Sequence, residues 1–214
     1  MVHVLSKEQS VTSEFLRELR DETIQKDRAK FRKNIERIGQ IAAYEISKDL
    51  EYVKEFTKSP LGIAQVKVLK EQPIIATILR AGLPLQQGIN NMFDQADLAY
   101  ISAYRKHSSP SEFEIVLEYV ATPNIDNRIL IICDPMLATG RSLVKTYQAF
   151  MQKGKPSKVY VVSVIGSKQG VDYVLSEIPN AELWIGVIDD KLDKNGYIVP
   201  GLGDAGDLSF GEKL

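Results

Sequence analysis

The sequence predicts an α/β protein: an open, mostly parallel β-sheet flanked by helices, with helices at the N-terminus and an antiparallel arm. Segments typical of strands and of helices alternate along the chain after residue 62, which favours a parallel sheet. The run Ile129–Cys133 is apolar on both faces, as in a strand that helices cover on each side. Before residue 55, apolar residues instead recur at helical spacing.

Composition narrows the class of protein. The chain has 214 residues, of which 44% are hydrophobic and 26% charged, and its formal net charge is −1. Such a chain is not disordered throughout, and this charge excludes a general nucleic-acid binder. No run approaches the roughly 20 apolar residues of a membrane span. The first ten residues show no signal core, and Cys133 is the single cysteine. We therefore expect a cytoplasmic protein that binds neither membranes nor nucleic acids.

The N-terminal segment is predicted to be helical. Residues 12–55 carry charged side chains mostly on the faces opposite one apolar stripe, which indicates helices packed on the rest of the protein. The stripe comprises Phe31, Ile35, Ile38, Ala42 and Ile46. The segment 58–62, with Pro60 and Gly62, breaks the pattern. We expect one domain over residues 1–214, with 1–57 as a helical N-terminal extension.

Beyond this break, strands and helices are expected to alternate. The predicted strands are Ile63–Leu69, Ile74–Leu79, Leu98–Tyr104, Ile129–Cys133, Lys158–Ile165 and Glu182–Ile188. The predicted helices are Leu83–Phe93, Ser142–Lys153 and Gln169–Glu177. Open sheets of this kind bind ligands at the carboxyl ends of their strands. The site is therefore expected in the loops that begin at Arg80, Arg105, Asp134 and Asp189.

One segment departs from the alternation. Glu112–Val120 has a period-two pattern, with Glu114 and Glu118 on one face and apolar residues on the other, which is typical of an antiparallel strand. Paired with Tyr100–Tyr104, it would form an arm over residues 105–122 whose polar tip is 107–111. We expect this arm to cover the site and to exclude water.

The strongest chemical feature is the loop that follows the apolar strand 129–133. Asp134 ends the strand, small residues follow, and a predicted helix begins at Ser142. A helix N-terminus behind a small-residue loop offers N–H groups to a phosphate, and a carboxylate at the strand end accepts hydrogen bonds from sugar hydroxyls. These features suit a phosphorylated ribose. A tight turn with Ser142 as a helix N-cap explains the same residues without a ligand.

This loop resembles the phosphoribosyl-diphosphate loop of phosphoribosyltransferases. Residues 134–140 read Asp-Pro-Met-Leu-Ala-Thr-Gly, which is similar to the variant found in the uracil phosphoribosyltransferase family. The resemblance implies a type I phosphoribosyltransferase fold. It also implies a phosphoribosyl-diphosphate-binding set that includes Asp134, Pro135, Met136, Leu137, Ala138, Thr139, Gly140, Arg141 and Ser142. Arg141 stands where family members usually carry glycine.

A second loop, Tyr197–Asp207, contains three glycines within six residues. These glycines permit a close approach of the backbone to a ligand. The segment resembles the uracil-binding signature of the same family, which reads the base largely with main-chain groups. The resemblance implies uracil contacts at Ile198, Gly203, Asp204 and Ala205, and places Asp204 in the phosphoribosyl-diphosphate site too. A site built for the edge of uracil rejects cytosine by leaving polar groups unpaired.

Two arginines complete the predicted site. Arg80 directly follows an apolar strand, and its planar guanidinium is suited to phosphate oxygens. An arginine that caps the sheet through a carboxylate is the alternative. Arg105 follows Tyr104 at another predicted strand end, where an exposed loop arginine is the alternative. The resemblance implies that both arginines contact the diphosphate, and it makes Arg80, Arg105 and Asp134 the catalytic residues.

The resemblance further implies transfer of a phosphoribosyl group to uracil, giving UMP and diphosphate, by a homodimer or higher homo-oligomer. Mg²⁺ is expected to be held mainly by the substrate diphosphate and waters, without a direct protein ligand. His3 and His107 lack the spacing of metal ligands. A phosphoribosyltransferase for another base and a nucleotide-sensing regulator that retains the fold remain as alternatives. Cys133 is expected to be a buried, unreactive thiol.

Overall fold

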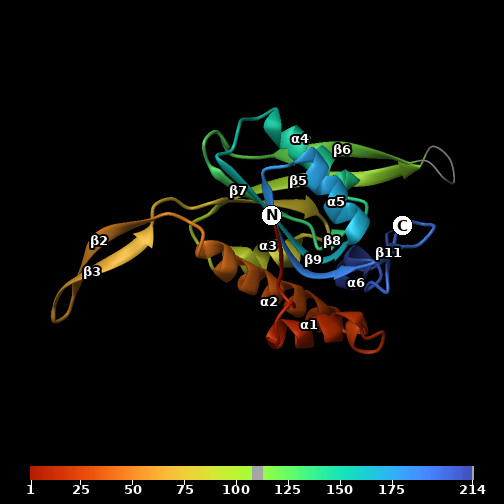
Figure 1. Cartoon of the computed structure of the whole chain (residues 1–214), viewed down its shortest axis with the longest axis horizontal. Coiled ribbons are helices and arrows are strands. Elements are labelled where there is room, and N and C mark those ends of the chain that lie inside the picture. Colours follow the sequence, from red (N-terminus) through yellow and green to blue (C-terminus); the bar gives the residue numbers. More distant parts are fainter. Residues whose placement is uncertain (108–112, 214) are drawn as a thin grey trace.

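The computed structural model describes residues 1–107 and 113–213 of the chain (Figure 1). Its centre is a sheet with the strand order β1-β10-β9-β7-β4-β5-β6, and β8 lies beside β9. Only β6 runs antiparallel to its neighbour among the described strands of this sheet, so the predicted fold class is confirmed. The strands are β1 (Val2–Val4), β4 (Ile74–Leu79), β5 (Asp97–His107), β6 (Phe113–Ala121), β7 (Ile129–Cys133), β8 (Met136–Leu137), β9 (Lys158–Ser167) and β10 (Ala181–Asp189).

Helices cover both faces of the sheet, as Figure 1 shows. One face packs against the layer of α1, α2 and α3, and the other face packs against α4 and α5. A short 3-10 helix, η1, joins α1 to α2, and α6 lies near the C-terminus. The bounds are α1 (Val11–Arg20), η1 (Ile24–Lys26), α2 (Arg28–Ser47), α3 (Leu83–Asn90), α4 (Arg141–Met151), α5 (Lys168–Glu177) and α6 (Ala205–Phe210).

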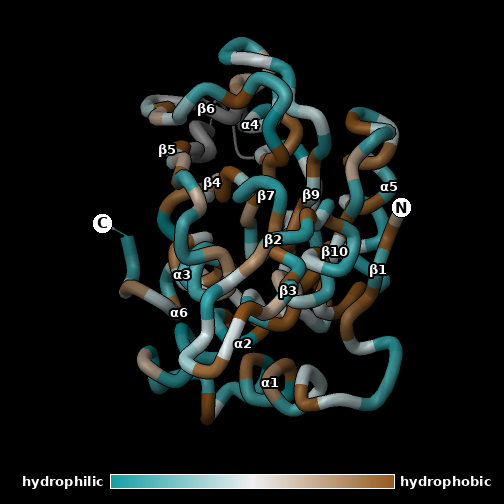
Figure 2. The backbone as a smooth tube through the Cα atoms, turned by 90° about the vertical axis from the view of Figure 1, so that its left-hand side faces the viewer, coloured by the Kyte–Doolittle hydropathy of each residue, from teal (hydrophilic) through white to brown (hydrophobic). Residues whose placement is uncertain are grey.

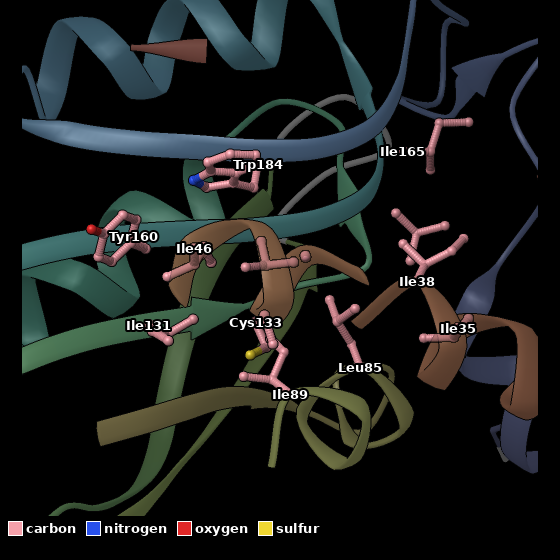
Figure 3. Close-up of a cluster of buried hydrophobic side chains, with 14 of the residues drawn as sticks. Ile35, Ile38, Ile46, Leu85, Ile89, Ile131, Cys133, Tyr160, Ile165 and Trp184 are labelled. Atoms are coloured by element: carbon pink, nitrogen blue, oxygen red, sulfur yellow. The ribbon is translucent and has the colours of Figure 1, made fainter. Parts of the chain in front are cut away.

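The position of β7 in the middle of the sheet explains why its sequence is apolar throughout. Ile131 and Cys133 point into the cluster that α2 and α3 cover (Figure 3). Leu130 and Ile132 point into the cluster under α4 and α5. All five residues of β7 are buried, as predicted for a doubly covered strand. The Cys133 thiol is fully buried, and burial together with the neighbouring Asp134 carboxylate raises its pKa, so the expected buried thiol is confirmed.

Helices α2 and α3 cross at close range because each carries a glycine at the contact. A Cβ at Gly39 would lie 2.6 Å from Leu85 O, and a Cβ at Gly88 would overlap Glu36 O. Helix α3 begins at Leu83, directly after the loop that carries Arg80. The position of this loop therefore depends on how closely α3 sits on α2.

The N-terminal segment is only partly helical, which corrects the prediction for residues 12–55. After Ser47 the chain enters β2 (Tyr52–Ser59), which pairs antiparallel with β3 (Gly62–Leu69). Aromatic and β-branched residues in 52–57 favour a strand, and the predicted break at 58–62 contains the turn of this hairpin. The predicted strand Ile63–Leu69 thus lies outside the main sheet. The range 1–57 also contains β1, an edge strand beside β10.

The predicted antiparallel pairing of the arm is confirmed. β5 and β6 pair from Tyr100 and Ala121 to His107 and Phe113, with a bulge after Ser102. β5 runs three residues beyond the predicted end at Tyr104. The rest of the predicted tip, residues 108–111, lies outside the described residues. Within the described part of the chain, no helix combines the length and apolar character that a membrane span requires.

Candidate functional site

The site residues follow the carboxyl ends of neighbouring parallel strands. Arg80 follows β4 and Asp134 follows β7, and these strands pair with Thr77 opposite Cys133. Asp189 is the last residue of β10, two strands further along the same sheet. Since parallel strands end at one edge, the fold brings Arg80 and Asp134 to neighbouring positions, as the sequence predicts.

The loop after Asp134 is anchored to β9. Its residues Met136 and Leu137 form the short strand β8. Just before them, Pro135 O accepts hydrogen bonds from two N–H groups of β9, at 3.1 and 3.0 Å. The Asp134 carboxylate accepts from Met136 N at 3.2 Å. The first half of the predicted phosphoribosyl-diphosphate loop is therefore held by main-chain bonds to the sheet.

The second half of this loop leads into helix α4, whose N-cap is Gly140 and not Ser142, so the N-cap alternative for Ser142 is wrong. Gly140 has φ 75°, a left-handed conformation that favours glycine, and it has no side chain that could cap the helix. Thr139 Oγ1 accepts from Arg141 N at a long 3.4 Å. The first N–H groups of α4 thus form a terminus of the type that binds phosphate.

Arg80 lies between the predicted diphosphate region and the C-terminal segment. Its Nη2 donates to Asp207 Oδ1 and to Gly211 O, both at 3.2 Å. Its Nε is buried and has no hydrogen-bond partner among the described residues. The carboxylate partner named as the structural alternative is therefore present. The buried Nε–H is nevertheless left for a further acceptor, which a buried polar atom requires.

The glycine-rich loop begins at a small hairpin of β11 (Lys191–Leu192) and β12 (Ile198–Val199). Gly201 and Gly203 have φ values of 64° and 90°. Asp204 ends the loop as the N-cap of α6, accepting from Gly206 N at 2.8 Å and Asp207 N at 3.0 Å. The side chains of Ile198 and Ala205 are buried. This arrangement fits a loop that would read its ligand with main-chain groups.

Two residues outside the predicted site sets hold this loop: Arg20, which sequence reasoning missed, and Asp189, which it named only as the start of a loop. Arg20 donates to both carboxylate oxygens of Asp189, at 2.9 and 2.7 Å, and to Gly201 O at 3.0 Å. Asp189 Oδ2 also accepts from Gly201 N at 2.9 Å. Burial raises the pKa of Asp189, but Arg20 and the Gly201 N–H outweigh burial and lower it overall. In the sequence, the signals that could have pointed to this pair are Arg20 at the end of a helix and Asp189 at the end of a buried strand.

A pocket of about 630 Å³ lies between this loop and η1. Gly203 and Asp204 of the predicted uracil set line it, whereas Arg80 and residues 134–142 do not. The other lining residues are Arg20, Gln25, Lys26, Arg28, Pro200, Gly201, Leu202, Asp207, Leu208 and Glu212. The pocket therefore borders one side of the loop, and the predicted phosphoribosyl-diphosphate residues lie outside its lining.

The described residues do not test the predicted role of the Arg105 side chain, nor the expectation that Mg²⁺ has no direct protein ligand. Arg105 lies within β5, with its backbone opposite Ile115, but its side chain falls outside the described residues. Its expected place at a strand end is wrong, because β5 continues to His107. Within residues 1–107 and 113–213, no group of three or more His, Cys, Asp or Glu side chains is placed to hold a metal ion.

Comparison with known proteins identifies the family. The family model of uracil phosphoribosyltransferase matches residues 6–212. A uracil phosphoribosyltransferase from Porphyromonas gingivalis is 48% identical over 211 residues and covers 98% of both chains. One from Pyrococcus furiosus is 36% identical over 204 residues, 94% of this chain and 86% of the relative. The solved structure of the AQ2163 protein from Aquifex aeolicus has a TM-score of 0.88 at 27% identity, over 99% of this chain and 98% of that one. The chain therefore belongs to the uracil phosphoribosyltransferase family.

Proposed function

We propose that this protein transfers the phosphoribosyl group of phosphoribosyl diphosphate to uracil, releasing UMP and diphosphate. The observation that carries the proposal is the contact between Arg80 and Asp207. This contact joins the loop after β4 to the helix that follows the glycine-rich loop, so the proposed diphosphate and base regions adjoin. The relatives that match over nearly the whole chain are named for this activity.

The proposed phosphoribosyl-diphosphate site uses three parts of the strand-end edge. The N-terminus of α4 and residues 138–142 hold the 5′-phosphate through N–H groups. Asp134 accepts hydrogen bonds from the ribose hydroxyls. Arg80 meets the diphosphate, and its buried, unpartnered Nε supports this role because the atom needs an acceptor. Arg105 is proposed to reach the same diphosphate from β5.

The reaction is a displacement at the anomeric carbon with oxocarbenium character. The chain holds uracil on one side of the ribose and the leaving diphosphate on the other, so that bond making and bond breaking lie in line. Arg80 stabilises the negative charge that develops on diphosphate. We propose that the β5–β6 arm covers the site and excludes water, which would otherwise hydrolyse the substrate.

Mg²⁺ supplies charge neutralisation on the diphosphate when bound. Diphosphate oxygens and waters are the ligands that this ion prefers, and it rarely needs an all-protein cage. We propose that the substrate diphosphate and waters would hold the ion, without a direct protein ligand. Arg80 would contact diphosphate oxygens that the ion leaves open.

We place the protein in the cytoplasm, as one domain over residues 1–214.

The test of the proposed function is release of diphosphate from a mixture of the protein, phosphoribosyl diphosphate, Mg²⁺ and a base. We expect diphosphate and UMP with uracil, and little product with cytosine or a purine base. Product from a purine would instead indicate a transferase for another base. Binding of both substrates without release of diphosphate would favour a nucleotide-sensing regulator and would contradict the proposal.

We also propose that the protein is a homo-oligomer in which the β2–β3 hairpin contacts a second copy of the chain. The hairpin projects from the body of the protein in Figure 1, and in the turned view of Figure 2 it lies in front of the body, on the side that faces the viewer. Phe56, Leu61 and Ile63 are 74%, 100% and 77% exposed. Lys54 lies directly opposite Lys67 on one face, and such a like-charge pair is unfavourable unless acidic groups of another surface lie against it. An isolated two-stranded hairpin is at best marginally stable, so this hairpin requires a partner.

Changing Phe56 to Glu is expected to weaken this assembly, because a charge would enter the apolar contact. Light scattering after gel filtration should give a mass that is a multiple of the chain mass for the unmodified protein, and a smaller mass for the variant. Val11→Glu is the matched control, since Val11 is 63% exposed but lies outside the hairpin. A monomeric unmodified protein, or an unchanged mass for Phe56→Glu, would rule out this contact.

A further inference from the structure

From the contacts of the glycine-rich loop, we infer that Arg20 and Asp189 are positioning residues that hold this loop in the conformation selective for uracil. Neither residue belongs to the predicted uracil or phosphoribosyl-diphosphate sets. The inference rests on the proposed function, because it takes Ile198–Ala205 as the part of the chain that contacts the base.

The contacts form a closed arrangement around one residue of the loop. The two side chains make a bidentate ion pair, with nitrogen–oxygen distances of 2.9 and 2.7 Å. Arg20 Nη1 donates to Gly201 O at 3.0 Å, and Asp189 Oδ2 accepts from Gly201 N at 2.9 Å. Both main-chain polar groups of Gly201 are therefore bound by the ion pair.

The ion pair is rigidly supported. Arg20 is the last residue of α1 and Asp189 is the last residue of β10, so both side chains start from regular elements. The side chain of Asp189 is only 8% exposed and that of Arg20 is 25% exposed. A bidentate pair with this degree of burial is held in one geometry and is screened less by salt than a surface pair.

The bound residue lies at the centre of the predicted base-reading segment. Gly201 has a φ of 64°, and a Cβ there would overlap Ile198 O, so the chain folds tightly back at this point. Ile198 and Gly203 lie on either side of it. On the other flank, Asp204 caps α6 and Asp207 holds Arg80. The loop is therefore held at its centre, through Gly201, and at its C-terminal end, through Asp204 and Asp207.

This attachment bears on selectivity because a main-chain site reads donors and acceptors by the orientation of its peptide groups. Uracil and cytosine differ in that N3–H and the O4 carbonyl of uracil are replaced by an N3 acceptor and an N4 amine. Rotation of a peptide plane exchanges a donor for an acceptor at the same place. Holding Gly201 by both of its polar groups opposes such rotation, which would otherwise lessen the rejection of cytosine.

The test measures kinetics with both bases for Arg20→Ala, Arg20→Lys and Asp189→Asn. For Arg20→Ala we expect the KM for uracil to rise roughly tenfold or more, and the uracil-over-cytosine ratio of kcat/KM to fall by a similar factor. The KM for phosphoribosyl diphosphate should change by less than about twofold, because its proposed contacts are elsewhere. Arg20→Lys should recover part of the loss, since lysine keeps the charge but not the bidentate geometry.

Arg17→Ala is the matched control, since Arg17 lies one turn earlier on α1 in an exposed pair with Glu14. Its KM for uracil and its uracil-over-cytosine ratio of kcat/KM should stay unchanged. Asp189→Asn keeps the size of the side chain, and an unchanged KM for phosphoribosyl diphosphate would show that the variant is folded. Unchanged uracil kinetics and base preference in folded variants would overturn the inference, as would equal losses for both substrates. An unmodified protein that forms no UMP would instead overturn the proposed function.

Discussion

Replacing Arg80 with alanine is expected to lower kcat roughly a hundredfold or more, the loss typical of removing one donor that meets developing charge. The KM for uracil should change much less, because the base loop keeps its attachment at Gly201. The structure adds a physical reason to expect this loss: Arg80 Nε is buried, without a partner among the described residues, close to where the leaving group would lie. Steady-state release of diphosphate measures the effect.

The Arg80 substitution also removes two contacts to the C-terminal segment, at Asp207 and Gly211. Arg32→Ala is the control for the loss of these contacts. Arg32 Nη1 donates to Ser209 O in the same C-terminal segment at 2.7 Å, but Arg32 lies on helix α2 and not at a strand end of the site. We expect near-normal turnover for Arg32→Ala. Near-normal turnover for Arg80→Ala as well would remove Arg80 from the mechanism.

Replacing Asp134 with asparagine is expected to lower kcat/KM for phosphoribosyl diphosphate roughly a hundredfold or more. A hydrogen bond to a charged acceptor contributes about 1.5–3 kcal/mol, and the carboxylate is proposed to accept two from the ribose. Asparagine keeps the size of the side chain but loses the charge, and its amide would direct a donor at a hydroxyl. Initial rates at varied phosphoribosyl diphosphate concentration give the value.

Asp126→Asn is the control for Asp134→Asn. Asp126 precedes β7 at its opposite end, and its Oδ1 accepts from Lys155 N at 2.7 Å, so it is a carboxylate with a main-chain partner away from the site. We expect an unchanged kcat/KM for this variant. If Asp134→Asn behaves in the same way, the ribose hydroxyls are held by another group.

Sequence reasoning succeeded where the pattern of residues reflects burial on both sides of a chain segment. The apolar run Ile129–Cys133 predicted a doubly covered strand, and the break at 58–62 contains a real turn, although this turn lies within the β2–β3 hairpin and not at the end of the helices. The same reasoning placed Arg80 and Asp134 at strand ends, because each directly follows a buried apolar run, whereas the end predicted at Tyr104 was wrong because β5 continues to His107. Identification of the base loop depended instead on resemblance, since its glycines indicate only a shaped backbone.

Sequence reasoning failed where the structure depends on contacts between two segments, either the two strands of a hairpin or residues far apart in the sequence. The segment Tyr52–Ser59 forms a strand by pairing with Gly62–Leu69 across a short turn, and the predicted helical segment wrongly extended into it. Arg20 reads as an ordinary basic residue at the end of a helix, which is favourable in itself. Its partner Asp189 is 169 residues away. No local pattern reveals such a pair, so the attachment of the base loop became visible only in three dimensions.

The close crossing of α2 and α3 limits how this enzyme can be made more thermostable. Glycines inside helices are usual first targets, because alanine reduces the entropy of the unfolded chain. At Gly88 the added methyl group would overlap Glu36 O and push α3 away from α2. Because α3 starts just behind Arg80, the displacement would reach the proposed diphosphate contact. Libraries aimed at heat resistance should therefore leave Gly39 and Gly88 unchanged and direct their changes to positions farther from this crossing.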